Sequence, residues 1–117
     1  MSSSAITFNL MEGSVSFSFT PAAANNLKAA LQELTERMKA ASAKVASGGG
    51  TSPQEPIEYQ YTGDVFLEIF CNPNIWANPF AAKVLITLRD ERIRLSTEAE
   101  LTRVIEDVNQ YLEQFHR

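Results

Sequence analysis

Residues 83–115 constrain the fold of this chain more than any other stretch of its sequence. They read KVLITLRDERIRLSTEAELTRVIEDVNQYLEQF, in which apolar residues first alternate with polar ones and then recur every three or four positions. Alternation is typical of a strand, and the wider spacing is typical of an amphipathic helix. The stretch therefore predicts two short antiparallel strands joined by a turn at Asp90 and Glu91, followed by a helix.

The start of this helix is predicted from a capping box. Thr97 and Glu100 have the S/T-x-x-E spacing, in which each side chain accepts a hydrogen bond from a backbone N–H at the helix N-terminus. One face of the predicted helix carries its apolar residues, which are Leu101, Val104, Ile105, Val108, Leu112 and Phe115. Such a stripe is expected to pack against the sheet.

A hairpin is predicted at the N-terminal end of the chain. Apolar residues alternate with polar residues in residues 6–11 and again in residues 14–19. Between these segments Glu12 and Gly13 are a two-residue turn candidate, because glycine adopts positive φ without steric cost. The hairpin would have one apolar face and one face rich in serine and threonine.

The first helix is predicted from about Pro21 to about Ala46. Thr20 and Pro21 match an N-cap residue followed by proline at the first helical position. Its expected buried stripe consists of Leu27, Ala30, Leu31, Leu34, Met38, Ala41 and Val45. Residues 47–56 (SGGGTSPQEP) then predict a flexible loop.

A second hairpin is predicted around a turn at Gly63 and Asp64. Its return strand, residues 65–70, is apolar on both faces. Phe66 and Phe70 point to one face, and Val65, Leu67 and Ile69 point to the other. The order of elements is thus β-β-α-β-β-β-β-α. This order predicts a single α+β domain over residues 1–117, with an antiparallel sheet of four to six strands packed by two principal helices.

The least regular stretch is CNPNIWANPFAA, residues 71–82. Two Asn-Pro pairs interrupt regular structure there, beside the apolar residues Ile75, Trp76 and Phe80. Aromatic anchors dominate the energetics of protein interfaces, so the loop is a candidate for partner binding. In the alternative interpretation, Trp76 and Phe80 fold back and close one end of the core.

Arg89, Arg92 and Arg94 form the one basic cluster of the sequence. If Ile93 and Leu95 face the core, Arg92 and Arg94 project together from the opposite face of the last strand. Charged residues of this kind commonly protect a sheet edge from aggregation. They would also suit an anionic partner group, such as an acidic tail or the C-terminal carboxylate of a peptide.

Composition argues against several classes of partner. The chain has 14 acidic and 10 basic residues, whereas nucleic-acid binding and polybasic membrane contact need a basic surface. A single cysteine, Cys71, excludes an internal disulfide and suits a reducing compartment, so a cytoplasmic location is expected. The sequence has no apolar run of about 20 residues, and its first residues do not resemble a secretory signal.

The residues do not predict an enzyme, a metal site or a cofactor. The sole histidine, His116, is the penultimate residue and has no second histidine or cysteine cluster to join. Cys71 has no neighbour in sequence that would activate its thiol, and the glycine run at residues 48–50 does not continue as a phosphate-binding loop. The acidic pair Glu106 and Asp107 is interpreted as a solvated helix face.

Three functions remain open at this point. The first is a non-enzymatic protein-binding module, an assembly chaperone or adaptor that captures an extended peptide. Its candidate partner-binding residues are Ile75, Trp76, Phe80, Arg92 and Arg94. The second is a structural or regulatory subunit that forms a homodimer through its sheet or first helix. The third is a small-molecule sensor whose aromatic pocket is built from Tyr59, Tyr61, Phe66, Phe70 and Trp76.

The segment NPNIWANPFAAKVLITLRDERIRLSTEAELTRVIEDVNQYLEQF resembles small cyanobacterial proteins, and among these the carboxysome shell assembly factors called CcmS. The resemblance covers roughly the C-terminal half of the chain and lies in the overall pattern of residues, without a short signature motif. It implies a cytosolic chaperone that binds the C-terminal tail of a shell protein and assists shell assembly.

Overall fold

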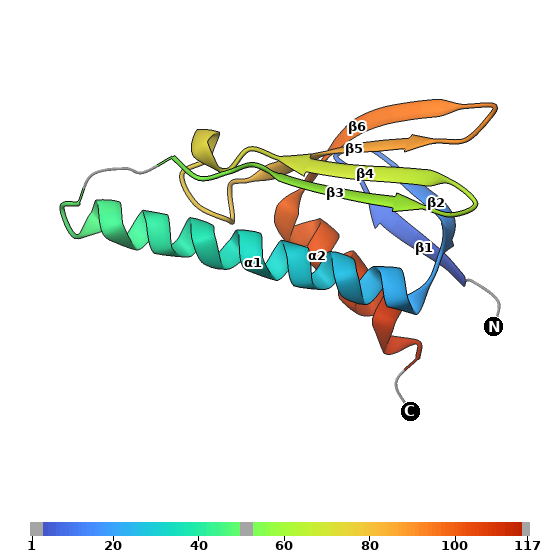
Figure 1. Ribbon diagram of the computed structural model, residues 1–117, viewed down its shortest axis with the longest axis horizontal. Coiled ribbons are helices and arrows are strands. Elements are labelled where there is room, and N and C mark those ends of the chain that lie inside the picture. The colour runs from blue at the N-terminus through green and yellow to red at the C-terminus, as the bar shows by residue number, and fades with distance from the viewer. Residues whose placement is uncertain (1–3, 50–52, 116–117) are drawn as a thin grey trace.

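The computed structural model describes residues 4–49 and 53–115 as six strands, two helices and one short 3₁₀ turn (Figure 1). In chain order these are β1 (Ser4–Asn9), β2 (Ser14–Phe19), α1 (Pro21–Ala46), β3 (Ile57–Thr62), β4 (Phe66–Cys71), η1 (Pro73–Ile75), β5 (Lys83–Arg89), β6 (Arg94–Glu100) and α2 (Leu101–Glu113). The predicted α+β class and the predicted order of strands and helices are confirmed.

The strands form two separate antiparallel sheets. β1 and β2 make a two-stranded hairpin, and β3, β4, β5 and β6 make a four-stranded sheet in which each strand lies beside its neighbour in the chain. Both helices lie on the same side of the four-stranded sheet (Figure 1). The helices therefore bury one face of this sheet and leave the other face uncovered.

The core is centred on Phe19, at the end of the N-terminal hairpin. The centre of its ring lies 5.7 Å from that of Phe17, 4.9 Å from that of Tyr61 and 6.0 Å from that of Tyr111. Each pair has the edge-to-face arrangement that aromatic rings prefer. The Tyr111 hydroxyl also donates a hydrogen bond of 2.9 Å to the Phe19 carbonyl oxygen. One residue thus joins the hairpin, β3 and α2.

Local signals in the first half of the chain are confirmed in part. The predicted hairpin is present, but its turn spans residues 10–13 and not Glu12 and Gly13 alone, because Asn9 lies opposite Ser14. Gly13 has a φ of 87°, and the Leu10 N–H donates to its carbonyl oxygen across a turn of four residues. The Thr20 hydroxyl accepts a hydrogen bond of 3.1 Å from the Ala23 N–H, as an N-cap residue does. Of the predicted stripe on α1, four residues are buried: Leu27, Leu31, Leu34 and Met38.

The remaining members of that stripe differ from the prediction or lie outside the description. Ala30 and Ala41 are only partly buried, and the side chain of Val45 is not among those described. Ala23 and Ala24 are buried in addition, so the first turn of α1 also contributes to the core. The predicted loop at residues 47–56 joins α1 to β3, with residues 50–52 outside the described part of the chain.

The predicted capping box at Thr97 and Glu100 is wrong. Both residues belong to β6, where Thr97 lies opposite Ile86 and Glu100 lies opposite Lys83. α2 begins directly afterwards, and Glu100 makes no side-chain capping bond. The first N–H of the helix, that of Leu101, donates instead to the Ala82 carbonyl oxygen at 3.0 Å, so strand pairing continues to the first residue of the helix.

The prediction of a solvated helix face at Glu106 and Asp107 holds for the first residue and is wrong for the second. Asp107 is only 3% exposed. One of its carboxylate oxygens accepts a hydrogen bond of 2.8 Å from the Asn9 N–H, and the other accepts one of 2.9 Å from the Asn9 side-chain amide. Arg103 Nε lies 3.5 Å from the same carboxylate. This contact fixes the end of β1 to α2.

Replacing Asp107 with alanine should destabilise the fold. The change would leave two donors of Asn9 without their acceptor, and we expect the free energy of unfolding to fall by about 2 kcal/mol or more. Urea unfolding followed by circular dichroism would measure it. The matched control is Glu106→Ala on the exposed side of the same turn of helix, where we expect a change within about 0.5 kcal/mol. Equal effects of the two variants would contradict the prediction.

Candidate functional site

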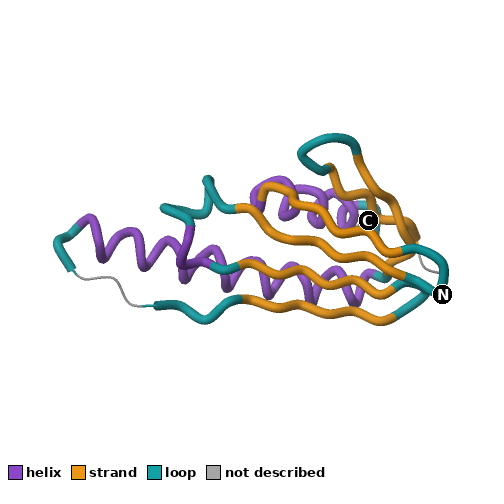
Figure 2. Tube along the Cα trace, turned by 90° about the horizontal axis from the view of Figure 1, so that it is seen from above, coloured by secondary structure: helices purple, strands orange, loops and turns teal. Residues whose placement is uncertain are grey.

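The uncovered face of the four-stranded sheet is the candidate site, and it is named the outer face here. Figure 2 looks onto this face, with the four strands side by side and the helices beneath them. Strand register aligns its side chains in three rows across the strands. They are Glu58, Phe70, Leu85 and Glu98; Gln60, Glu68, Thr87 and Ser96; and Thr62, Phe66, Arg89 and Arg94.

The first row forms an apolar end of the outer face. Phe70 lies directly opposite Leu85, and Leu85 is 43% exposed although it belongs to a central strand. Glu58 and Glu98 flank this apolar pair on the two edge strands. Opposed side chains on one face are the nearest neighbours in a sheet, so the pair presents a continuous apolar surface.

The Asn-Pro loop, residues 72–82, lies at the same end of the sheet and is held by its own asparagines. The Asn72 side-chain oxygen accepts from the Asn74 N–H at 3.0 Å. The Asn78 side-chain oxygen accepts from the N–H groups of Phe80 and Ala81 at 2.9 and 3.0 Å. These are Asx turns, which replace regular backbone pairing where proline interrupts it. The loop is therefore a defined structure.

This loop is also tied to α1 and to the segment before β3. The Ser42 hydroxyl donates to the Ala77 carbonyl oxygen at 2.8 Å. The Asn74 side chain accepts from the Gln54 N–H at 2.7 Å and donates to the Gln54 carbonyl oxygen at 2.8 Å. These three attachments hold the loop in place from two sides.

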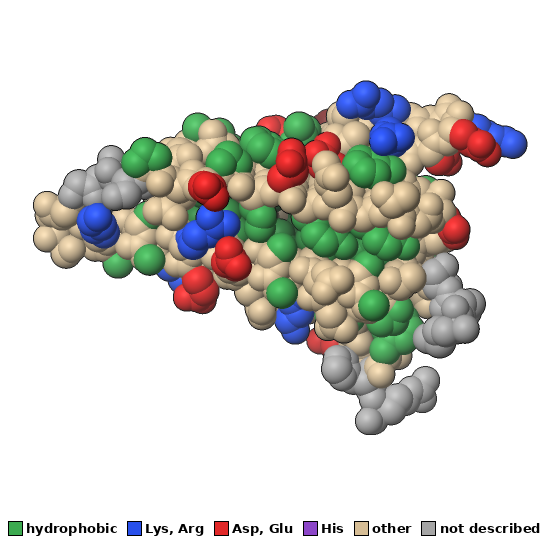
Figure 3. Space-filling model, in the orientation of Figure 1, with side chains coloured by type: hydrophobic (Ala, Val, Ile, Leu, Met, Phe, Trp, Pro, Cys, Tyr) green, Lys and Arg blue, Asp and Glu red, His purple; other side chains and the backbone are tan. Residues whose placement is uncertain are grey.

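The three apolar residues predicted for partner binding in this loop have different surroundings. Ile75 is 67% exposed and Phe80 is 76% exposed, so Phe80 does not fold back onto the core. Trp76 lies half-buried and packs against the core. Hydrophobic side chains gather along the upper margin of the molecule in Figure 3, from this loop towards the sheet.

The third row forms a basic end of the outer face. Arg89 stacks on the ring of Phe66, with its guanidinium carbon 4.3 Å from the ring centre, and Arg94 lies directly opposite Arg89 on β6. Figure 3 shows the basic side chains gathered over the β5–β6 hairpin. Within residues 4–49 and 53–115, no ion pair includes Arg89, Arg92 or Arg94. Their charges are thus available to a ligand.

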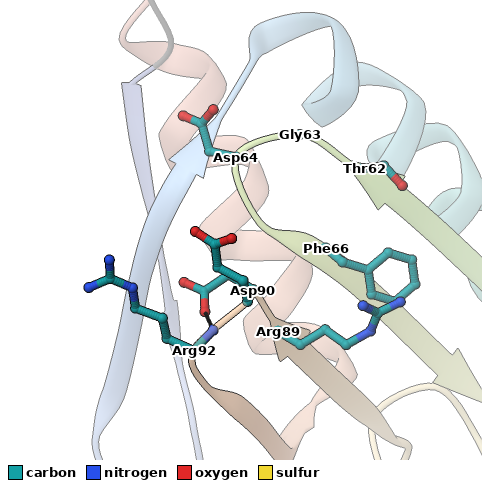
Figure 4. A pocket seen from close by; sticks show the side chains of 8 residues that line it. Thr62, Gly63, Asp64, Phe66, Arg89, Asp90 and Arg92 are labelled. Carbon is teal, nitrogen blue, oxygen red and sulfur yellow. Dashed lines mark hydrogen bonds between the residues drawn. The ribbon is translucent and has the colours of Figure 1, made fainter.

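An open pocket of about 450 Å³ adjoins this basic end, between the β3–β4 and β5–β6 turns (Figure 4). Asp90 lies on its wall and organises the second turn, since its carboxylate accepts from the N–H groups of Arg92 and Ile93 at 2.7 and 2.9 Å. These two bonds lower the pKa of Asp90 below its ordinary value. In Figure 4, Arg89 lies against Phe66, whereas Arg92 points away from it.

The predicted placement of the arginines is partly wrong. Ile93 is 66% exposed in the turn, and β6 begins only at Arg94. Arg92 therefore belongs to the turn, and Arg94 has Arg89 as its neighbour on the outer face. Arg89, which belongs to the predicted basic cluster, and Phe66, which was considered for the aromatic pocket, are not among the predicted partner-binding residues. The alternation of residues along β5, which places Leu85, Thr87 and Arg89 on one face, was the signal that could have identified Arg89.

The five predicted partner-binding residues do not form one cluster. Ile75, Trp76 and Phe80 lie in the loop before β5. At the other end of β5, Arg94 lies opposite the last residue of the strand and Arg92 lies in the turn that follows. Leu85 and Arg89 are four residues apart on that strand, a distance of about 13 Å in extended chain. The outer face connects the two groups.

The aromatic residues considered for a small-molecule pocket lie on two faces of the sheet. Tyr59 and Tyr61 point to the helices; the Tyr59 hydroxyl donates to the Ala23 carbonyl oxygen at 3.1 Å, and Tyr61 packs against Phe19. Phe66 and Phe70 point to the outer face. The predicted pocket of these residues is therefore not formed.

Of the two side chains considered for catalysis, one is buried and the other lies outside the described residues. Cys71 is buried, and burial raises the pKa of its thiol to about 11. His116 lies outside the described residues. Among the residues that are described, no three histidine, cysteine or acidic side chains gather as a metal site would require.

None of the helices within the described ranges is long and apolar enough to cross a bilayer. No family model, no curated protein and no solved structure matches this chain.

Trp76 and Phe80 should respond differently to truncation. Trp76→Ala removes side-chain packing from the core, and we expect it to lower the free energy of unfolding by about 2 kcal/mol. Phe80→Ala removes a ring that is already exposed, so we expect a change within about 0.5 kcal/mol. Urea unfolding of both variants measures the difference. A large loss of stability in Phe80→Ala would show that its ring is packed.

Cys71 should react slowly in the folded protein. Burial and a pKa of about 11 leave little thiolate at neutral pH. We expect an aromatic disulfide reagent to label the native thiol at least about 100-fold more slowly than the thiol of the urea-unfolded chain. The absorbance of the released thiolate measures the rate. Similar rates in the two states would contradict the burial of Cys71.

Proposed function

We propose that this chain is a non-enzymatic protein-binding module that holds an extended segment of a partner protein across its outer face. The observation that carries the proposal is that one uncovered sheet face holds both an apolar pair and a basic pair. The apolar pair is the partly buried Phe70 with the exposed Leu85, and the basic pair is Arg89 with Arg94, neither of which forms an ion pair within the described residues. An exposed apolar surface beside unpaired cations is unusual on a surface that contacts only water.

The chemistry of the face specifies the segment it would hold. Phe70 and Leu85 would contact an apolar side chain of the segment, and the exposed side chains of Ile75 and Phe80 would extend that contact. Arg89 and Arg94 would take a carboxylate, either from an acidic residue or from the end of a chain. A guanidinium group binds a carboxylate through two parallel N–H donors.

The geometry suits an extended segment better than a helix. About 13 Å separates the apolar row from the arginine row, which an extended chain spans with four residues. Stacking on Phe66 holds the Arg89 guanidinium in a defined plane, so less conformational entropy is lost when a carboxylate binds. The direction of the segment follows: its apolar part lies near the loop and its acidic part near the β5–β6 turn.

The resemblance of the C-terminal half to the CcmS assembly factors supplies a candidate partner. Under this proposal the chain acts as an assembly chaperone, and the segment is the C-terminal tail of a carboxysome shell protein. The terminal carboxylate of such a tail would meet Arg89 and Arg94. The resemblance supports this partner, whereas the general peptide-binding proposal rests on the outer face alone.

Fluorescence anisotropy with short labelled peptides tests the proposal. We expect peptides with apolar residues followed by acidic residues to bind more tightly than scrambled peptides or peptides with lysine at the acidic positions. Leu85→Ser and Arg94→Glu should each weaken binding by about tenfold or more, because each removes one of the two contacts.

Two matched controls accompany these variants. Met11→Ser removes an exposed apolar side chain from the β1–β2 turn, and Lys39→Glu reverses a charge on the exposed side of α1. Neither should change the affinity by more than about twofold. If no peptide binds better than its scrambled control, or if the controls weaken binding as much as the outer-face variants, the proposal is wrong.

A further inference from the structure

The outward edge of β3 has no partner among the described residues. β3 pairs with β4 along one side, and no backbone hydrogen bond from its other side reaches another described segment. In Figure 2, β3 lies at the rim of the molecule, with no strand or helix beyond it. An edge of this kind carries a row of free N–H and C=O groups that can pair with another strand.

The register shows which backbone groups are free. The Gly63 N–H donates to the Val65 carbonyl oxygen at 3.0 Å, and hydrogen-bonded residues alternate along an antiparallel pair. Tyr59 and Tyr61 therefore direct their backbone groups to β4. The groups directed outwards belong to Glu58, Gln60 and Thr62.

This edge has few of the features that usually prevent strand pairing, and Glu58 is the one charged residue of β3. The sequence of β3 is IEYQYT, which contains no lysine, proline or glycine, and its pairing with β4 continues without a bulge from Ile57 to Thr62. At the opposite edge of the sheet, β6 carries Arg94, Glu98 and Glu100. β3 is thus the less protected of the two edges.

We propose that β3 pairs in antiparallel orientation with β3 of a second copy of this chain, around a two-fold axis at Gln60. In this register Gln60 lies opposite the partner subunit's Gln60, and Glu58 lies opposite the partner subunit's Thr62. The outward N–H and C=O groups of Glu58, Gln60 and Thr62 are then all paired with the second copy, which gives about six hydrogen bonds. The helices of both copies remain on the same side of the joined sheet.

Registers centred nearer the start of β3 are less favourable. A shift by two residues in one direction places Thr62 opposite the partner subunit's Pro56, which has no N–H to donate. A further shift places Glu58 opposite the partner subunit's Glu58, and like charges in opposed positions repel. The register centred on Gln60 avoids both problems.

Side chains on β3 also suit pairing with their own copies. A glutamine amide has both donors and acceptors, so Gln60 complements the partner subunit's Gln60. Tyr59 lies opposite the partner subunit's Tyr61 in the closely spaced type of pair, which favours contact between rings. Both tyrosines are already held, Tyr59 by its bond to Ala23 and Tyr61 by its contact with Phe19, so dimerisation orders them little further.

The dimer would be one continuous sheet with four strands from each copy. Its two outer faces would lie on the same side, because the two-fold axis is perpendicular to the sheet. This inference does not depend on the proposed function, since it uses only the edge of β3.

Sedimentation equilibrium of the full chain over a range of concentrations tests the inference. We expect the chain to form dimers and Gln60→Pro to weaken dimerisation by at least about tenfold. Because the Gln60 N–H points away from β4, proline at this position removes a donor only from the free edge. Ser96→Pro is the matched control: Ser96 has the equivalent outward position on β6, and this variant should dimerise normally.

Substitutions at Thr62 test the register and do not depend on proline. The lysine of Thr62→Lys would oppose the partner subunit's Glu58 and should tighten the dimer several-fold, whereas Thr62→Glu should weaken it several-fold. If circular dichroism shows that Gln60→Pro does not fold, the comparison of Thr62→Lys with Thr62→Glu tests the inference in its place. A wild-type chain that stays monomeric overturns the inference, as does equal dimerisation of Thr62→Lys and Thr62→Glu.

Discussion

The direct junction between β6 and α2 determines the arrangement of the rest of the molecule. β6 ends at Glu100 and α2 begins at Leu101, with no loop between them. The hydrogen bond from the Leu101 N–H to Ala82 holds the first turn of the helix against the start of β5. α2 therefore passes under the sheet at a fixed position, where Asp107 and Tyr111 reach the N-terminal hairpin. A loop at this junction would leave the orientation of the helix undetermined.

This arrangement places all of the helical cover on one face of the sheet. The apolar side chains of the inner face, such as Leu67, Ile69 and Ile86, are fully buried. The outer face keeps Phe66, Phe70 and Leu85 without a covering element, and a central strand with apolar residues on both faces is usually covered on both sides. Under the proposed function, the bound segment of a partner supplies the second cover.

The sequence predicts those elements whose signals are local. Alternation predicted all six strands, and Thr20 with Pro21 predicted the start of α1. The start of α2 was not predictable in this way, because strand pairing with Lys83 and Ala82 extends β6 through Thr97 and Glu100. Asp107 looked solvated because its partner, Asn9, is 98 positions away in the chain. Periodicity reports which face of an element is apolar, and it does not report which distant polar group lies against it.

The candidate site was predicted in its parts and not in its arrangement. The exposed loop residues Ile75 and Phe80 and the basic residue Arg94 were identified from composition and local pattern. Their separation along β5, and the stacking of Arg89 on Phe66, depend on the register between strands. Register is set by the packing of the whole sheet, so no short stretch of sequence contains it.

The contact between Asn9 and Asp107 has a consequence for synthesis on the ribosome. The hairpin of β1 and β2 leaves the exit tunnel before α2, and 98 positions separate the two residues of this contact. During translation Phe8, Phe17 and Phe19 therefore have only α1 and the early strands to pack against, and an isolated two-stranded hairpin is marginal in water. The native core therefore closes only after α2 has emerged.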